Sequence, residues 1–245
     1  YSVIDLATGE ELAAYRDDVA MNPASTMKLL TSYAALRELG NQYTWTTEFK
    51  SDGKVVNGIL QGDLYWVGTG DPLFDQKDLL AMIWQLNNKG IYGINGRLIL
   101  DKSIWSSIGS ADNFDDDSDA AFTTPPDPQM LAFKVAWLQV EANEFGKPQL
   151  KLDPDMPDVM LNTNITTRAQ GTCRDIRNYL KIKSNGYSID IQGSLPSSCI
   201  GKKTFVNILP MNDFALQSFK AHWFTINSSP LTIQAATGRA PTNAT

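Results

Sequence analysis

The chain has 245 residues, of which 42% are hydrophobic and 20% are charged, so it is long enough for one large domain or two ordinary ones with a sizeable core. Its formal net charge is −6 at pH 7 and it contains no basic cluster, which argues against nucleic acid as a partner. No apolar run approaches the length that crosses a bilayer, so membrane contact is expected to be peripheral at most.

The first predicted elements are two short strands, residues 1–6 and 11–15, which lead into a helix. Asn22 is a good N-cap, Pro23 suits the first helical position, and Gly40 is typical of the position just after a helix end. The small or apolar positions along this helix are Leu29, Leu30, Tyr33, Ala34, Leu36 and Leu39. They predict a helix that is buried behind its first turns, with those turns at the floor of a cleft.

Ser25 and Lys28 are three residues apart at the start of this helix, so their side chains share one helix face. A serine hydroxyl needs a nearby base to act as a nucleophile, and a lysine amine can be that base where burial or a neighbouring cation lowers its pKa. The helix N-terminus adds a backbone N–H for a developing oxyanion. This is the S-x-x-K arrangement of serine acyl-transferases and β-lactam-binding enzymes. The tetrapeptide taken alone also fits a solvated first turn.

Short strands and turns follow the helix, with strands expected at 45–50, 58–67 and 94–100 and an amphipathic helix at 78–89. The strands at 58–67 and 94–100, with the helix at 78–89 between them, form a strand–helix–strand unit. The glycine pair within 68–72 lacks the residues of a phosphate-binding loop, and the sequence predicts no cofactor.

A loop-like, acidic stretch covers residues 103–128. Five aspartates cluster within eight residues of it: Asp112, Asp115, Asp116, Asp117 and Asp119. The run lacks the glycine and glutamate that an EF-hand calcium loop requires, and a solvated acidic loop is the simpler interpretation.

The two cysteines, Cys173 and Cys199, flank two strand-like runs at 178–183 and 187–192 that turn into a hairpin. A hairpin would bring its flanks together, which favours a disulfide and an oxidising compartment such as a periplasm. Two unrelated buried thiols are the alternative. Further strands are expected at 134–141 and 149–152, a β-rich region is expected from 166 to 208, and a last strand is expected at 232–236.

The only histidine, His222, lies in a predicted amphipathic helix over 213–224, where a structural role is expected rather than membership of a Ser-His-Asp triad. Without a Cys/His cluster, the sequence predicts no metal site.

With these residues in view, the chain resembles the N-terminal part of the D-alanyl-D-alanine carboxypeptidase/endopeptidase family (DacB type, class C low-molecular-mass penicillin-binding proteins, peptidase family S13). The resemblance runs over nearly the whole chain. It is carried by residues 22–30, 62–66 (GDLYW), 68–72 (GTGDP), 94–101 (INGRLILD) and 122–126 (FTTPP).

The resemblance implies an α+β multidomain fold, in which a penicillin-binding/β-lactamase-like transferase domain is interrupted by two nested β-rich inserted domains. Residues 1–45 would begin the transferase domain. Residues 46–104 and 205–245 would form the first inserted domain, of α/β character, and residues 105–204 the β-rich second one.

The resemblance also implies a periplasmic serine carboxypeptidase or endopeptidase that cleaves D-Ala–X bonds in peptidoglycan stem peptides and cross-links. Ser25 would form the acyl-enzyme, with β-lactam antibiotics as well as with substrate, and Lys28 would take its proton. Asp117 and Phe122 would meet the charged end of the stem-peptide side chain, since a carboxylate can pair with the ammonium of diaminopimelate.

Two motifs that the family needs, S-x-N and K-[ST]-G, do not occur: Lys203-Thr204 is followed by Phe205, and Ala236 precedes Thr237-Gly238. We therefore expect a truncated chain that is inactive alone. The alternative is a non-catalytic fragment or peptidoglycan-binding scaffold module. A compact β-lactamase fits less well, because the large insertion directly after the Ser25 helix is foreign to that layout.

Overall fold

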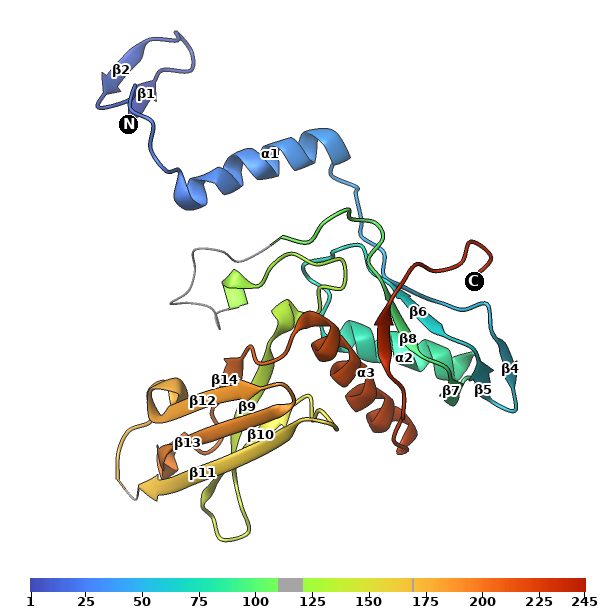
Figure 1. The fold of residues 1–245 in the computed structure, drawn as a ribbon. Coiled ribbons are helices and arrows are strands. Elements are labelled where there is room, and N and C mark those ends of the chain that lie inside the picture. Colours follow the sequence, from blue (N-terminus) through green and yellow to red (C-terminus); the bar gives the residue numbers. More distant parts are fainter. Residues whose placement is uncertain (110–120, 169) are drawn as a thin grey trace. The chain divides into compact units, whose positions relative to one another are not determined.

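The computed structural model describes residues 1–109, 121–168 and 170–245, and its fold is mixed α+β with several small sheets (Figure 1). The chain divides into two compact units, Tyr1–Thr44 and Trp45–Thr245. Each unit is described separately below. Among the described residues, no helix combines the length and the apolar character needed to cross a bilayer.

The first unit contains an antiparallel pair, β1 (Ser2–Ile4) and β2 (Glu11–Ala14), then the short 3-10 helix η1 (Ala24–Thr26) and the α-helix α1 (Met27–Leu39). Gly40 ends α1 with a φ of 78°, and its N–H donates to the Leu36 carbonyl. Glycine fits this position because a side chain would be strained at a positive φ.

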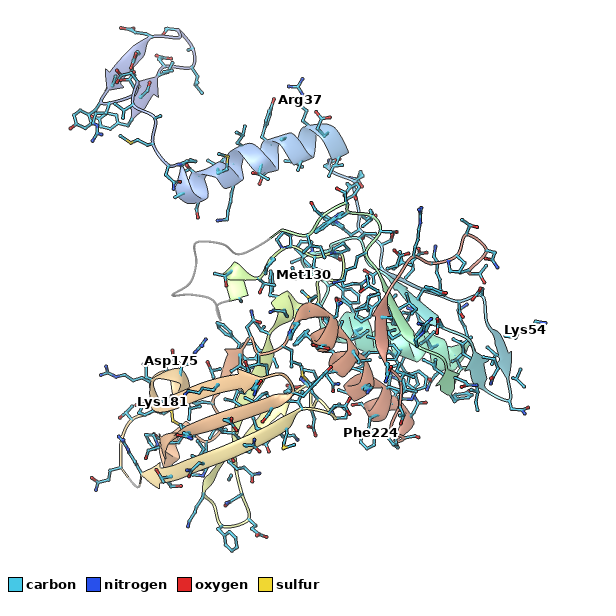
Figure 2. The ribbon with its side chains drawn as sticks, in the orientation of Figure 1. Arg37, Lys54, Met130, Asp175, Lys181 and Phe224 are labelled. Carbon is cyan, nitrogen blue, oxygen red and sulfur yellow. A yellow bond between two sulfur atoms is a disulfide. The ribbon has the colours of Figure 1, made fainter. Side chains whose placement is uncertain are left out.

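The prediction that α1 is buried behind its first turns is wrong for this structure. No residue of α1 is buried, and Leu29 is 76% exposed (Figure 2, where Arg37 of the same helix is labelled). A helix buries its apolar side chains only against another element. The apolar spacing established a helix with an apolar side but could not establish what covers that side.

The second unit is built on a four-stranded sheet in the order β15-β8-β6-β3. Its strands are β3 (Glu48–Lys50), β6 (Leu64–Val67), β8 (Leu98–Asp101) and β15 (Ala235–Thr237). β8 pairs in parallel with both β6 and β15, and every residue of β8 is buried. Burial on both faces explains the apolar run from Leu98 to Leu100.

Two helices complete this core: α2 (Gln76–Asn88) and α3 (Met211–Asn227). Asp75 caps α2, and Asp78 completes a capping box, so the helix begins two residues before the predicted start. Phe49 of β3 meets both Trp66 of β6 and Phe219 of α3 edge-on, with ring centroids 5.7 and 5.6 Å apart. These rings join α3 to the sheet.

The strand predicted over 58–67 is interrupted. It forms β5 (Ile59–Gln61) and β6, which lie in different sheets, because the chain turns at Gly62 with a φ of 151°. β5 pairs with β4 (Lys54–Val56) and with β7 (Gly93–Asn95) in a separate small sheet.

The remainder of the second unit contains two three-stranded sheets. One has the order β10-β9-β14, with strands β9 (Ala136–Ala142), β10 (Pro148–Asp153) and β14 (Lys203–Val206). The other has the order β11-β13-β12, with strands β11 (Met160–Arg168), β12 (Leu180–Asn185) and β13 (Ser188–Pro196). β11 extends the predicted β-rich region to Met160, because its asparagines and threonines face solvent on an edge and obscure the strand pattern.

Cys173 and Cys199 form a disulfide between the flanks of the β12–β13 hairpin. Their neighbours in a small buried cluster include Val140 of β9 and Leu195 of β13, one from each sheet. The bridge therefore lies where the two sheets meet. Short 3-10 helices occupy Ile176–Tyr179 (η5) and Ser197–Cys199 (η6) beside it.

The segment before β9 is anchored to the four-stranded sheet by buried polar groups. The amide of Gln129 donates to the Trp66 and Asp101 carbonyls at 2.7 and 3.0 Å. Lys102 Nζ lies 2.7 Å from Asp127 Oδ2, and 10% and 5% of these two side chains are exposed. Since a lone charge is costly to bury, both partners are needed there. This anchor sits at the root of the acidic stretch.

Replacing Lys102 by Met should lower the free energy of unfolding by about 3–5 kcal/mol, because the buried carboxyl group of Asp127 would lose its ion-pair partner. Urea unfolding followed by tryptophan fluorescence measures the loss. The matched control is Arg97→Met, which removes an ion pair of the same 2.7 Å length in which the arginine is 59% exposed. That exposed pair is expected to contribute about 0.2–1 kcal/mol. Equal effects of the two changes would show that the burial of Lys102 does not matter.

Candidate active site

The turn before α1 brings Ser25 and Lys28 together. Asn22 Oδ1 accepts the Ala24 N–H at 2.9 Å, and the Pro23 φ of −71° is helical. The predicted cap is thus off by one residue: Pro23 is the N-cap of the 3-10 helix, and Asn22, the residue before it, accepts the Ala24 N–H through its side chain. Ser25 lies in η1 and Lys28 in the first turn of α1.

Lys28 Nζ donates a hydrogen bond to Ser25 Oγ at 2.8 Å. This distance lies within the range over which a base can take a proton from a nucleophile. A neutral amine at this position could accept the hydroxyl proton directly, whereas the ammonium form can only donate to the oxygen. The pair thus has the geometry of a nucleophile and its base.

Ala24, the residue before the serine, has a φ of 45°. A non-glycine residue in this left-handed region costs on the order of 1–3 kcal/mol, and such residues concentrate at functional sites. Sequence analysis missed this feature because alanine gives no sign of a left-handed backbone. The unusual turn sets the direction from which Ser25 enters the helix.

The other predicted site residues belong to the second unit. Asp117 lies outside the residues that the structure describes. Phe122 belongs to the 3-10 helix η3 (Ala121–Thr123), which precedes the anchored segment around Gln129. Their expected role therefore stays a prediction.

His222 lies on α3, where its Nε2 is 2.8 Å from Gln76 Oε1 of α2. Burial lowers the pKa of the imidazole, which favours the neutral ring. The hydrogen bond joins the two helices and agrees with the structural role expected from the sequence. Across the described residues, no group of three or more His, Cys, Asp or Glu side chains is arranged to hold a metal ion.

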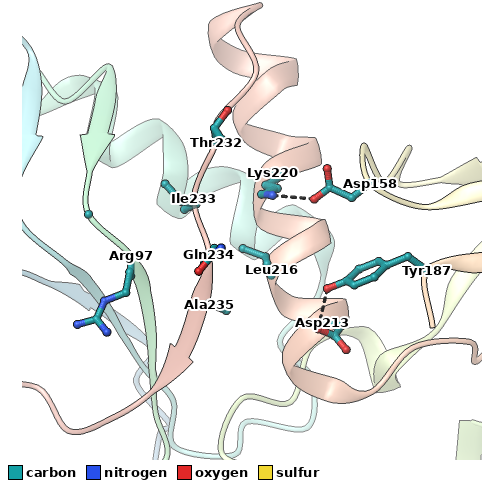
Figure 3. Close-up of a pocket in the computed structure, with 11 residues that line it drawn as sticks. Arg97, Asp158, Tyr187, Asp213, Leu216, Lys220, Thr232, Ile233, Gln234 and Ala235 are labelled. Atoms are coloured by element: carbon teal, nitrogen blue, oxygen red, sulfur yellow. Dashed lines mark hydrogen bonds and ion pairs between the residues drawn. The ribbon is translucent and has the colours of Figure 1, made fainter.

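A cleft of about 810 Å³ lies in the second unit between α3 and the chain that leads into β15 (Figure 3). On α3, Lys220 Nζ lies 2.7 Å from Asp158 Oδ2, and Asp213 Oδ1 accepts the Tyr187 hydroxyl at 2.7 Å. Sequence analysis did not single out these residues, because they come from separate segments that only the fold brings together. A neighbouring cleft of about 1060 Å³ shares Asp158 and Lys220.

The ionisation of these groups follows from their contacts. The hydrogen bonds from Lys220 and Gln217 hold the pKa of Asp158 below its usual value. Burial and the hydrogen bond to Asp213 raise the pKa of Tyr187 to about 12. At neutral pH the cleft therefore contains an ionised Asp158 and a neutral phenol.

Comparison with known proteins identifies the family. The model of the D-Ala-D-Ala carboxypeptidase 3 (S13) family matches residues 1–240. The chain belongs to this family. The resemblance inferred from the sequence motifs is thereby confirmed.

Among the relatives, a D-alanyl-D-alanine carboxypeptidase DacB of Haemophilus influenzae is 34% identical over 137 residues, which are 54% of this chain and 28% of that protein. A D-alanyl-D-alanine carboxypeptidase of Actinomadura sp. is 36% identical over 112 residues, which are 46% of this chain and 21% of that protein. The crystal structure of penicillin binding protein 4 (dacB) from Haemophilus influenzae aligns with a TM-score of 0.74 and 21% identity. The alignment covers 99% of this chain and 53% of the chain in that crystal structure. At this identity the similarity supports the fold alone. The chain thus spans about half the length of that solved relative.

The Asp158–Lys220 pair predicts a pH dependence of stability. The pKa of Asp158 is lower in the folded state than in the unfolded state, so the unfolded chain binds more protons between the two values and stability rises with pH there. This contribution is present above about pH 4 and is lost as the pH falls through the folded pKa. In Lys220→Met, the free energy of unfolding should change less steeply below about pH 4. Guanidinium unfolding of both proteins across this pH range tests the prediction. The same slope of unfolding free energy against pH in Lys220→Met and wild type would contradict it.

Proposed function

We propose that this chain supplies the nucleophile and its base to a periplasmic serine DD-carboxypeptidase/DD-endopeptidase that cleaves D-Ala–X bonds in peptidoglycan. The observation that carries the proposal is the 2.8 Å hydrogen bond between Lys28 Nζ and Ser25 Oγ. Membership of the S13 family supports the reaction class. The S-x-N and K-[ST]-G motifs of the family would come from outside these 245 residues.

In the proposed reaction, Ser25 Oγ attacks the carbonyl carbon of the D-Ala–X bond while neutral Lys28 accepts the hydroxyl proton. The tetrahedral intermediate then expels the amine of the leaving residue, which takes that proton, and leaves an ester on Ser25. Water attacks the ester while Lys28 accepts its proton, and Lys28 returns that proton to Ser25 Oγ as the C–Oγ bond breaks and the peptide leaves with a free carboxyl group. The backbone N–H of Ser25 is the oxyanion donor that this chain can offer.

Lys28 must lose its charge to serve as the base. In this structure both Ser25 and Lys28 are exposed. A lysine loses its proton near neutral pH only where burial or another cation disfavours the charged form. We propose that the remaining part of the catalytic domain provides that environment, and that the exposed apolar side of α1 packs against it.

β-Lactams would acylate Ser25 by the same attack, and the resulting ester on Ser25 would be hydrolysed slowly. A second crystal structure of the Haemophilus influenzae relative is described as a complex with a novel beta-lactam. That structure aligns with a TM-score of 0.66 and 19% identity over 100% of this chain. This relative supports the proposed partner class for the present protein.

Ser25→Ala should abolish covalent labelling by a fluorescent penicillin, because it removes the attacking oxygen. Lys28→Met should slow labelling about 10²- to 10⁴-fold, which is the usual contribution of a general base. The measurement is intact mass and gel fluorescence on the longest natural form of the protein. Ser32→Ala, an exposed serine on the same helix, is the control and should label normally. A penicilloyl adduct on the Ser25→Ala protein would refute the assignment.

Asp117 and Phe122 are proposed to contact the stem-peptide side chain, with the carboxylate of Asp117 paired to its ammonium. Asp117→Ala should therefore raise KM for a diaminopimelate-containing peptide and leave acylation by benzylpenicillin nearly unchanged. Asp116→Ala, at the adjacent aspartate, is the control. A parallel loss with both ligands would mean that the segment has a structural role instead.

The nested division into residues 1–45, 46–104 with 205–245, and 105–204 is part of the same proposal. Its support is the pairing of β15 with β8, which brings residue 235 beside residue 98. The Cys173–Cys199 disulfide supports an oxidising compartment.

The alternative function, a peptidoglycan-binding scaffold, is favoured by the open clefts along α3. Hydrolysis of a D-Ala-D-Ala peptide by this chain alone would rule it out.

A further inference from the structure

The larger cleft beside α3, of about 1060 Å³, has no part in the chemistry proposed for Ser25. Its volume is at the upper end of the range for small-ligand sites. It lies within the second unit and is lined by the second half of α3, by β9 and β10, and by the segment that joins β10 to β11. Leu152 and Met156 are buried in its wall.

Two polar contacts fix the orientation of carboxylates in this cleft. Gln139 of β9 donates from Nε2 to Asp153 Oδ2 at 2.7 Å, and both residues line the cleft. Lys220 of α3 donates to Asp158 Oδ2 at 2.7 Å. Each contact uses one oxygen of its carboxylate. Among the described residues nothing donates to Asp153 Oδ1 or Asp158 Oδ1, so both oxygens can accept a hydrogen bond from a ligand.

The imidazole of His222 adds a third kind of acceptor to the lining. The amide nitrogen of Gln76 donates to Ser218 Oγ at 3.1 Å, so the amide oxygen is the atom that faces the imidazole. Since this oxygen can only accept, Nε2 of the neutral ring carries the proton and Nδ1 is an acceptor. In the part of the chain that the structure describes, no group donates to Nδ1.

The lining contains donors as well as acceptors. The ammonium of Lys151 and the hydroxyl of Thr225 both come from exposed residues. A sugar hydroxyl donates one hydrogen bond and accepts up to two, so a polyhydroxy ligand uses such a mixture fully. An anionic ligand is disfavoured because carboxylates outnumber lysines. The carboxylates are Glu141, Asp153, Asp155 and Asp158, and the lysines are Lys151 and Lys220.

Phe224 gives the cleft an aromatic surface. It lines the cleft from α3 and is 52% exposed (labelled in Figure 2). The C–H groups on one face of a sugar ring pack well against the electron-rich face of an aromatic ring. A metal ion would need clustered ligands instead, and the described residues hold no group of three or more His, Cys, Asp or Glu side chains arranged for one.

We propose that this cleft binds a glycan chain of uncharged, N-acetylated sugars. One sugar ring packs on Phe224, and its hydroxyl groups bond to Gln139 and Asp153. The polyhydroxy class follows from the lining. The choice of N-acetylated sugars rests on the proposed function, because peptidoglycan is a chain of such sugars that carries the stem peptides. The cleft would keep the protein on the glycan strand between cleavage events.

The experiment is isothermal titration of the longest natural form of the protein with the tetrasaccharide of N-acetylglucosamine. The wild-type protein should bind it. Phe224→Ala should raise Kd about fivefold or more, because the ring contact is lost. The matched control is Trp84→Ala, which removes an aromatic residue of α2 that is also 52% exposed but does not line the cleft. This control should leave Kd unchanged.

A second pair of variants tests the polar contacts. Gln139→Leu keeps the size of the side chain and removes its amide, so Kd should rise about fivefold, the effect of one lost hydrogen bond. Gln149→Leu makes the same change at an exposed residue of β10 outside the cleft lining and should leave Kd unchanged. The tetrasaccharide of galacturonic acid should not compete, because its carboxylates would be repelled.

Three results would overturn the proposal. The tetrasaccharide could fail to bind at millimolar concentration, or it could bind with the same Kd in wild type, Phe224→Ala and Gln139→Leu. Binding of the de-N-acetylated tetrasaccharide alone would show a site for amines instead.

One further measurement separates this inference from the proposed function. Acylating Ser25 with benzylpenicillin beforehand should leave Kd for the tetrasaccharide unchanged, since no residue of the first unit lines the cleft. A protein that binds the tetrasaccharide but is not acylated would count against the proposed function alone. A protein that is acylated but does not bind the tetrasaccharide would count against the glycan site alone.

Discussion

Parallel pairing between β8 and β15 is the constraint on which the second unit depends. Leu98 donates its N–H to the Gln234 carbonyl, and Ala235 to Thr237 lie beside Leu98 to Leu100. Parallel neighbours need a crossover connection, and here the crossover contains two whole sheets and α3. The buried carboxylate of Asp101 reinforces the closure, since it accepts the N–H groups of Ser103 and Ala240 at 2.9 and 2.8 Å. Burial would raise the pKa of Asp101, but these hydrogen bonds outweigh it and hold the pKa low.

The same closure holds both ends of the chain segment that forms the two three-stranded sheets. Both of their roots, after β8 and before α3, are held by the same core, so the intervening chain need only fold between two fixed points. The Lys102–Asp127 pair and the buried amide of Gln129 fix one root, and the α3 packing against Phe49 fixes the other. The acidic stretch that carries Asp117 leaves from the first of these roots.

The candidate nucleophile is organised in a different way. Its geometry is local: Asn22, Ala24, Ser25 and Lys28 lie within seven residues, and the contact between serine and lysine needs only one helical turn. Local geometry can position two groups but cannot desolvate them, because desolvation requires other elements to exclude water. The exposed side of α1 shows the same limit, because its hydrogen bonds form within one segment whereas burial needs a second element.

The sequence alone determined the features that depend on neighbours in the chain. Gly40 marked the end of the Ser25 helix, and Asn22 and Pro23 marked the start of its first turn to within one residue. The i to i+3 spacing placed Ser25 and Lys28 on one face, and the motifs identified the family. Only the tertiary structure decided which segments pair at a distance: the separation of β5 from β6 into different sheets, the insertion of β11 beside β13, and the meeting of Tyr187 and Asp158 with α3. Periodicity and capping report local backbone preference, whereas strand partners, buried ion pairs and clefts depend on the total burial that the folded chain achieves. For that reason the contact between Ser25 and Lys28 was predictable residue by residue, and the surfaces around it were not.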